Sequence, residues 1–487
     1  MSTEARERTI NFGAGPSALP TNVLLEATKA MIDYKGTGIG VTELSHRSST
    51  FKEIVTKAES DLRALLDIPD NYAVFFTQGG GTEQFSATVL NMLAAHAARN
   101  PSYGDKAPPV DYLVSGSWSS KAYAEAKRLT PNVNLVNNLR GNIGDASKPI
   151  PEPSQWSLSS PDNFPAMLYY CDNETIDGFE LPSDFIKKLP QAYRERVPIV
   201  ADCSSNILSR PVDVRAHGVV YFAAQKNIGP SGTTVVVVRR DLVADPDALN
   251  AAYVPPIPAM LVYKNMVDNE SLYNTPPMFP MYVSGLVFQD LRQLGGVPKM
   301  QEIAKEKSSA VYGVLDAYPN LYRAAVAHPE FRSQMNVTFR VLDPKTHEPS
   351  GALEEQLVKK CSEEHMVQVK GHRSVGGLRV SMYNAITPEQ AKRLAGVLDQ
   401  FAQQVLKVGQ VALVVGQDHG AHARLGAAKP ARGWGWFDGL FDQPFDPLGQ
   451  CPIRAAVAHQ IQPDAPAFRG PFDGEQLFLD VDELVDR

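Results

Sequence analysis

The sequence predicts an α/β fold in which a large domain has a mostly parallel central sheet and a smaller α+β domain follows it. Between about residues 73 and 240, short apolar runs alternate with helical patterns, which is the arrangement of βαβ units. The chain has 487 residues, more than one ordinary core requires, so two or three domains are expected. Beyond about residue 300, strand-like runs and helical patterns no longer alternate in this way, which indicates a smaller α+β domain.

The large domain contains apolar runs that are bounded by turn residues and read as buried strands. They lie at 72–77, 110–116, 166–171, 197–205, 218–223 and 233–240. Right-handed crossovers place the loops after parallel strands along one edge of the sheet, where ligands bind in such folds. Functional residues are therefore expected directly after these runs.

Changes in composition suggest where the domains begin and end. We expect an N-terminal segment at 1–30, a large domain at 31–295, a small C-terminal domain at 296–407 and a tail at 408–487. The small domain has strand-like runs at 335–342 and 377–383, each accompanied by a helical pattern. The tail is rich in Gly, Pro, Ala and Asp without a sustained period, a composition typical of low-complexity, disordered segments.

The overall composition is that of a globular protein that acts on small molecules. Hydrophobic residues make up 43% of the chain and charged residues 21%, as in soluble domains. The net charge of −7 and the absence of a long basic run argue against a nucleic-acid partner. The 4 cysteines are widely spaced and form no CxxC pair, which indicates reduced thiols and no metal site. No secretory signal and no run of ~20 apolar residues is visible, so we expect a cytoplasmic protein without a membrane partner.

A glycine-rich stretch follows the first strand of the large domain. It reads TQGGGTEQ at 77–84 and leads into a helical pattern. Free amide groups at a helix start bind anions, and glycine allows a phosphate to approach the backbone closely. A tight turn is the simpler alternative. The stretch lacks both the Gly-Lys-Ser/Thr of a nucleotide P-loop and the GxGxxG of a dinucleotide site.

Two charged residues stand at the ends of later strands. Asp202 ends one apolar run, and Lys226 follows the next one with Gln225 beside it. Taken singly, they could be a structural ion pair and a solvated strand end. Lysine has a reference pKa of ~10.4 that burial lowers, which suits it for imine chemistry. In this order, the glycine stretch, Asp202 and Lys226 indicate pyridoxal phosphate: a phosphate cradle, a partner for the ring nitrogen and an amine for the aldehyde.

Several longer stretches occur in an order that belongs to one family. They are INFGAGPSALP, VTELSHRSSTF, FTQGGGTEQFSA, SGSWSSKAYAEAKR, YYCDNETIDGFEL, ADCSSNILSRPVDV, FAAQKNIGPSG, YNTPPMFPMYVSGLVFQDL and VKGHRSVGGLRVSMYNA. On these stretches, from about residue 10 to 405, the chain resembles the phosphoserine aminotransferases, class-V aminotransferases of PLP fold type I. The resemblance implies a PLP-dependent transaminase that acts as a homodimer.

The resemblance also implies a set of cofactor-binding residues. These are Gly81, Thr82, Trp118, Thr175, Asp202, Gln225, Lys226, Asn274 and Thr275. Lys226 would bind the cofactor aldehyde as a Schiff base and Asp202 would pair with the ring nitrogen, so these two are the expected catalytic residues. Trp118 would stack on the ring and Thr175 would hydrogen-bond its phenolic side. The last two residues of the set would come from the partner subunit, so that the active sites are shared.

Substrate recognition is implied at two His-Arg pairs and one further arginine. By resemblance, Arg379 would bind the α-carboxylate, while His46, Arg47, His372 and Arg373 would meet the phosphate or the side-chain carboxylate of glutamate. Such anions require several cationic donors. The implied reaction of L-serine biosynthesis is the reversible transamination of 3-phosphohydroxypyruvate with L-glutamate, which gives O-phospho-L-serine and 2-oxoglutarate.

The sequence departs from the family pattern at three positions, and other functions can be weighed against this one. Thr82 stands where many bacterial members have arginine, and Gly13 and Ala14 replace serines. One alternative is another fold type I enzyme, such as an alanine–glyoxylate-type transaminase or a cysteine desulfurase, but no cysteine lies in a suitable C-terminal loop. A second is an inactive relative that serves as a binding scaffold. The intact Lys226 and Asp202 argue against that alternative.

Overall fold

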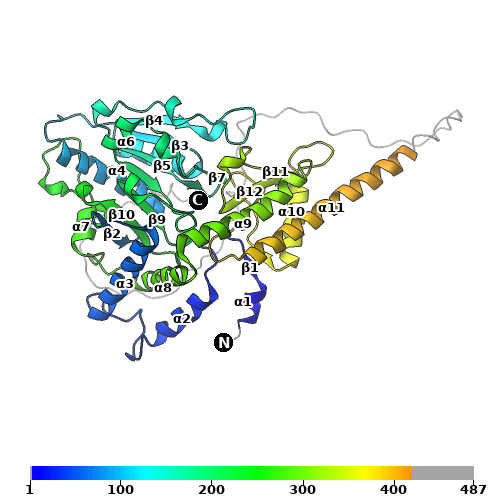
Figure 1. The fold of residues 1–487 in the computed structure, drawn as a ribbon, viewed down its shortest axis with the longest axis horizontal. Helices are drawn as coiled ribbons and strands as arrows, with labels where there is room; N and C mark the ends of the chain where they lie inside the picture. The colour runs from blue at the N-terminus through cyan, green and yellow to red at the C-terminus, as the bar shows by residue number, and fades with distance from the viewer. Residues whose placement is uncertain (1–2, 419–487) are drawn as a thin grey trace, which may run out of the picture. The chain divides into compact units, whose positions relative to one another are not determined.

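The large domain is organised around a seven-stranded sheet. The structure is a computed structural model, which describes residues 3–418 of the chain. The strand order is β2-β10-β9-β8-β5-β3-β4 (Figure 1). The bounds in that order are β2 (Tyr72–Thr77), β10 (Thr234–Arg239), β9 (Val219–Ala223), β8 (Ile199–Asp202), β5 (Met167–Cys171), β3 (Val110–Val114) and β4 (Val133–Asn138). Only β10 runs antiparallel to its sheet neighbours, so the predicted mostly parallel sheet is confirmed.

One strand of this sheet was not predicted. Strand β4 lies at the edge of the sheet and pairs with β3 alone. Its sequence VNLVNN contains asparagines, which are depleted in strands and common in turns. Most of its side chains are only half-buried. An edge position tolerates such residues because one side of the strand needs no partner.

Helices cover both faces of the sheet. The bounds of the helices are α1 (Glu4–Arg8), α2 (Thr21–Ile32), α3 (Ser49–Leu66), α4 (Gly80–Arg99), α5 (Ser117–Leu129), α6 (Gln191–Arg196), α7 (Tyr263–Asp268), α8 (Met278–Gln293), α9 (Gly296–Ala317), α10 (Gly351–Glu363) and α11 (Pro388–Asp418). Strand β10 shows why two layers are needed: Val235 and Val237 pack into the core that contains α3 and α8, whereas Val236 and Val238 pack into the core that contains α4 and α5. A strand buried on both faces reads as a continuous apolar run.

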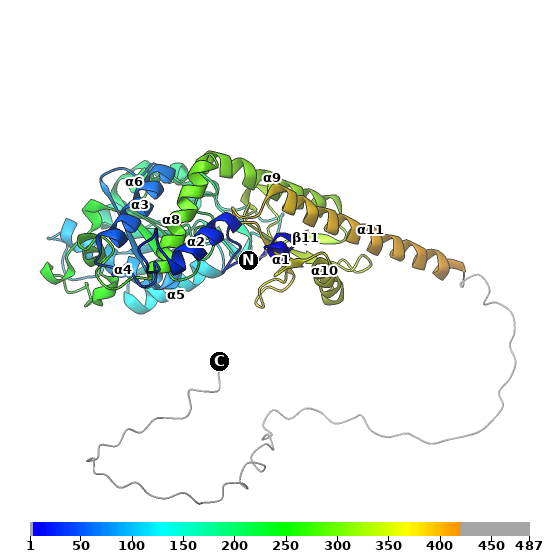
Figure 2. The same cartoon turned by 90° about the horizontal axis from the view of Figure 1, so that it is seen from below.

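The small domain is built on a three-stranded antiparallel sheet of β11 (Tyr322–Ala324), β12 (Asn336–Val341) and β14 (Leu378–Ser381), with β12 in the centre. Figures 1 and 2 both show α9 and α11 side by side along this domain. Helix α10 begins where the Ser350 hydroxyl accepts a hydrogen bond from the Leu353 amide at 3.4 Å, as N-cap serines do. No helix within residues 3–418 has the length and hydropathy needed to cross a bilayer.

The two ends of the described chain both attach to the small domain. Strand β1 (Ile10–Asn11) pairs in parallel with β13 (Met366–Val367), and Ile10 belongs to the core of the small domain. Helix α11 continues to Asp418, so residues 408–418, which the sequence analysis assigned to the tail, are helical. The rest of the predicted tail, 419–487, lies outside the described residues.

The sheet brings the loops that follow its strands to one edge. Strands β3, β5, β8 and β9 are parallel, and β2 points the same way because β10 is antiparallel to both β9 and β2. The carboxyl ends of these strands therefore share one edge, where α/β sheets bind ligands. A short hairpin of β6 (Asn173–Glu174) and β7 (Phe179–Glu180) extends from this edge.

Candidate active site

A cavity of ≈ 190 Å³ lies at this edge of the sheet. The predicted cofactor residues that line it are Gly81, Thr82, Trp118, Thr175, Asp202, Gln225 and Lys226. Sequence reasoning did not single out Cys171, Asn173 and Ser204, which line it as well. Asn173 and Ser204 could have been identified from the sequence, because they are polar residues that closely follow the β5 and β8 runs.

Lys226 is half-buried, and its amine has a single hydrogen-bond acceptor among residues 3–418. Its Nζ donates to the carbonyl oxygen of Ala14 at 2.7 Å. Burial, and secondarily the charge of Arg379, lower the pKa of Lys226 to about 8. Gly15 makes the close approach possible, since its φ is +134° and an added Cβ would lie 2.9 Å from the Lys226 Cδ. The amine is therefore deprotonated far more readily than that of an exposed lysine.

Asp202 ends strand β8 as a buried carboxylate. Its Oδ1 accepts a hydrogen bond from the Ser204 amide at 2.9 Å, and its Oδ2 accepts one from the Tyr221 hydroxyl at 3.1 Å. Burial raises the pKa of Asp202. No cationic side chain within the described part of the chain lies at ion-pair distance from it. Asp202 is thus available to pair with a protonated group that enters the cavity.

The glycine stretch presents free amides to the cavity. Helix α4 begins at Gly80, whose amide donates to the Thr234 hydroxyl at 2.8 Å. The amides of Gly81 and Thr82 donate to no acceptor among residues 3–418. A Cβ on Gly81 would lie 3.6 Å from the Asp202 Oδ2 and would occupy cavity space. A helix start with free amides and an open approach is an anion site.

Two carboxylates connect the loop that carries Thr175 to the start of α5, which carries Trp118. Glu174 accepts a hydrogen bond from the Trp118 amide at 2.8 Å, and Asp177 accepts one from the Ser117 amide at 2.7 Å. Burial, and then the neighbouring Asp177, raise the pKa of Glu174 to about 7. Both carboxylates lie at the start of α5, where the helix dipole favours negative charge. The loop that carries Thr175 is therefore tied to the helix that carries Trp118.

Asn274, Thr275, His46 and Arg47 do not line this cavity. The Asn274 amide donates to the Gln78 side chain at 3.4 Å, and the Thr275 hydroxyl lies 3.3 Å from the His46 Nδ1. Asn274 thus lies beside the start of the glycine stretch, and Thr275 lies beside His46. The Arg47 side chain is exposed and forms no ion pair in the described chain.

Arg379 reaches the cavity wall from the small domain. Its Nη1 donates to the carbonyl oxygen of Thr175 at 3.3 Å, and its half-buried guanidinium has no carboxylate partner within residues 3–418. His372, on the same domain, has its Nδ1 2.7 Å from the Ser374 hydroxyl. Burial and the charge of Arg379 lower the pKa of His372. Arg373 is exposed beside it. An unpaired, partly desolvated guanidinium suits a carboxylate ligand.

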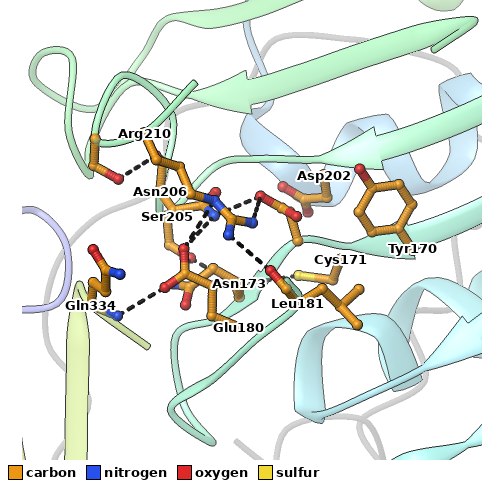
Figure 3. A network of polar contacts seen from close by, with 12 residues as sticks. Tyr170, Cys171, Asn173, Glu180, Leu181, Asp202, Ser205, Asn206, Arg210 and Gln334 are labelled. Atoms are coloured by element: carbon orange, nitrogen blue, oxygen red, sulfur yellow. Dashed lines mark hydrogen bonds and ion pairs between the residues drawn. The ribbon is translucent and has the colours of Figure 1, made fainter. Parts of the chain in front are cut away.

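A buried ion network, not predicted from the sequence, involves the segments that follow β5 and β8 (Figure 3). The Arg210 Nη2 lies 2.7 Å from the Asp172 Oδ2, and its Nε lies 3.2 Å from the Glu180 Oε1. The Gln334 amide of the small domain donates to the other Glu180 oxygen at 2.8 Å. The Asn206 side chain donates to both carboxylates. The network thus joins the segments after β5 and β8 to the small domain.

Comparisons with known proteins identify the family to which this chain is similar. The family model for class-V aminotransferases matches residues 9–394. The phosphoserine aminotransferase of Drosophila melanogaster is 41% identical over 80% of this chain and 98% of its own length. The phosphoserine aminotransferase structure from Bacillus circulans subsp. alkalophilus is 37% identical with a TM-score of 0.70, over 82% of this chain and 99% of its own. The structure of the PLP-bound phosphoserine aminotransferase from Trichomonas vaginalis is 35% identical with a TM-score of 0.68, over 80% of this chain and 99% of its own.

The residues of the cavity fit pyridoxal phosphate. Within residues 3–418, free amides at the start of α4 suit its phosphate and the buried Asp202 has no cation at ion-pair distance, while Lys226 has a lowered pKa. Gly81 leaves the space between these groups open. The cofactor is therefore pyridoxal phosphate, and the large domain has PLP fold type I. The chain belongs to the class-V aminotransferases, PLP-dependent transaminases, and within them to the phosphoserine aminotransferases.

Proposed function

We propose that the chain catalyses reversible transamination between L-glutamate and 3-phosphohydroxypyruvate, which gives 2-oxoglutarate and O-phospho-L-serine. The relatives named above carry the name of this activity. The observation that supports it most directly is the convergence of Lys226, Asp202 and the free amides of α4 on one cavity. The proposed setting is the cytoplasm and L-serine biosynthesis.

The residues proposed to hold the cofactor, from its phosphate to its ring, are Gly81, Thr82, Gln225, Trp118, Thr175 and Asp202. Pyridoxal phosphate, when bound, supplies an aldehyde for the amino group and a ring that accepts electrons from the substrate. The carboxylate of Asp202 is buried and has no cation at ion-pair distance in the described part of the chain. It therefore gains most by holding a proton on the ring nitrogen, because a paired buried charge is far less costly than an isolated one.

Lys226 is proposed to attach the cofactor and to carry the proton during the reaction. A general base works best when its pKa is near the working pH, and the pKa of Lys226 is about 8. Within residues 3–418, its Nζ donates a hydrogen bond only to the Ala14 carbonyl oxygen. Such an amine can change partners without breaking an ion pair.

Substrate anions are proposed to bind Arg379 and the two His-Arg pairs. Arg379 would bind the α-carboxylate that every amino donor carries. Its position beside Thr175 and the absence of an ion pair to it among the described residues support this role. His46, Arg47, His372 and Arg373 would meet the phosphate or the distal carboxylate of glutamate. Charge-assisted hydrogen bonds are roughly twice as strong as neutral ones. A phosphorylated substrate should therefore be strongly preferred.

We also propose a homodimer with shared active sites. Asn274 and Thr275 do not line the cavity of their own chain, although they lie beside Gln78 at the approach to the glycine stretch. This position supports the proposal that they serve the cofactor phosphate of a neighbouring subunit.

The substrate proposal is tested with the purified protein, pyridoxal phosphate and 2-oxoglutarate, to which phosphoserine, serine and alanine are offered separately. Serine and alanine lack the phosphate and would lose about two charged hydrogen bonds, worth about 1.5–3 kcal/mol each. Their kcat/KM should therefore lie about 10²- to 10⁴-fold below that for phosphoserine. Equal rates with alanine would remove the substrate proposal and leave the cofactor assignment standing.

Two variants separate the parts of the substrate. Arg47→Ala should lower kcat/KM for phosphoserine and leave the visible absorbance of the bound cofactor unchanged. Arg379→Ala should lower kcat/KM for phosphoserine and for glutamate alike, because both carry the α-carboxylate. Arg99→Ala, an exposed arginine at the far end of α4, is the control and should change neither value.

A further inference from the structure

A second buried lysine lies in the small domain, outside the cavity. Lys307 is part of helix α9, and its side chain is fully buried. Within residues 3–418 no carboxylate is at ion-pair distance from its Nζ. A buried, unpaired ammonium is costly unless hydrogen bonds compensate for the lost hydration, so the contacts of this group need an explanation.

The ammonium of Lys307 is matched to three backbone carbonyls. Its Nζ donates to the oxygens of Met382 at 2.9 Å, Tyr383 at 2.8 Å and Ile386 at 2.9 Å. A charged lysine has three donors, so all of them are used. Burial lowers the pKa of Lys307 to about 7, whereas three acceptors favour the charged form. A methionine at this position would remove the Lys307 donor from all three carbonyls, of which only that of Tyr383 keeps another donor among the described residues, the Ile386 amide at 2.9 Å.

The turn at residues 382–386 also touches the active site. The Tyr383 hydroxyl donates to the carbonyl oxygen of Ala14 at 3.1 Å, and the same oxygen accepts the hydrogen bond from the Lys226 Nζ at 2.7 Å. The next residue of the turn, Asn384, donates its amide to the Asn227 side chain at 2.8 Å. The turn therefore contacts both the acceptor of the catalytic amine and the residue that follows Lys226.

We propose that Lys307 is a positioning residue for the transamination, which holds the 382–386 turn and, through Tyr383, keeps the Ala14 carbonyl where it orients the Lys226 amine. The inference rests on the proposed function of Lys226. Lys307 would then affect catalysis as well as stability. Loosening the turn should let water reach Lys226 and should shift the Lys226 amine from its position.

The test compares Lys307→Met with the parent enzyme in the full-length chain. The first readout is the pH midpoint at which an amine-reactive reagent labels Lys226, measured by peptide mass spectrometry on protein freed of pyridoxal phosphate. We expect the midpoint to rise from near 8 towards the ordinary lysine value of ~10.4. The second is steady-state kinetics with phosphoserine, in which kcat should fall about ten- to hundredfold while KM changes less than about threefold.

Two further variants make the test decisive. Lys305→Met removes an exposed lysine from the same helix and should leave the midpoint and kcat at parent values. Tyr383→Phe keeps the three bonds of Lys307 and removes only the hydroxyl that contacts Ala14, so it should shift the midpoint in the same direction.

The outcomes separate a positioning residue from a merely structural one. A folded Lys307→Met protein with a lowered melting temperature but the parent midpoint and kcat would overturn the proposal. If Lys307→Met does not fold, Tyr383→Phe decides alone. A parent-like midpoint in Tyr383→Phe would also overturn the proposal in either case, because the link to Ala14 would then have no effect. If only the substrate proposal fails, the midpoint shift of Lys226 should still be observed.

Discussion

Replacing Arg210 by methionine should destabilise the large domain strongly. Arg210, Asp172 and Glu180 have side chains that are only 11%, 7% and 5% exposed. Methionine fills part of the volume of the arginine but leaves two carboxylates buried without their cation. Breaking a buried pair by removing one partner costs about 3–5 kcal/mol of the free energy of unfolding, and we expect Arg210→Met to fall in this range.

The assay is urea unfolding at one pH, with the slope of the transition compared between variant and parent. An unchanged slope means that the shift in midpoint reports stability. Arg215, which pairs with Asp67 on the surface, supplies the control, and Arg215→Met should not measurably change the midpoint. Because Asp172 lies between cavity residues, the variant should also bind pyridoxal phosphate more weakly.

A triple variant tests the physical reason. Arg210→Met combined with Asp172→Asn and Glu180→Gln removes the stranded charges as well as the cation. If uncompensated charge causes the loss, the triple variant should be more stable than Arg210→Met alone. A loss below about 1 kcal/mol in the single variant, which is the range of exposed pairs, would refute the reasoning.

Four further predictions follow from the site and the chain ends. Lys226→Ala should lose the visible absorbance of the bound cofactor and nearly all turnover while its circular dichroism is unchanged; retained absorbance would contradict the assignment. Mixing Lys226→Ala subunits with subunits that carry both Asn274→Ala and Thr275→Ala should give dimers that are more active than either variant alone. The absence of such a gain would count against shared sites. A chain ending at Asp418 should keep its kcat, because the family match ends at residue 394; inactivity would show that the removed part is required. Glu174 has a folded pKa of about 7 against ~4.3 for free glutamate, so the folded state binds the extra proton and stability should fall as pH rises between these values. Glu174→Gln should flatten that fall in pH-dependent melting curves, and an unchanged slope would contradict it.

The sequence predicts those residues of the site whose position follows directly from the end of a strand. Asp202 and Lys226 follow apolar runs that are long enough to be read as strands, and the order of the strands puts their ends at one edge. Strand β4 was missed because its asparagines are typical of turns, and only pairing at the sheet edge makes it a strand. Arg210 was missed for another reason: its partners lie far from it in sequence, and neither spacing nor composition indicates such a pairing.

The two buried lysines show why residue type alone does not determine function. Burial lowers the pKa of both Lys226 and Lys307, and each lies in an otherwise ordinary stretch of sequence. Lys307 satisfies three carbonyls at once, which favours its charged form and fixes its position. Among the described residues, Lys226 donates from its Nζ to one carbonyl oxygen, that of Ala14, and it lines the cavity. A buried lysine with three acceptors holds a turn in place, whereas an amine with one acceptor that lines a cavity can leave that acceptor and form a new bond. The number of acceptors around each nitrogen therefore separates the positioning lysine from the catalytic one.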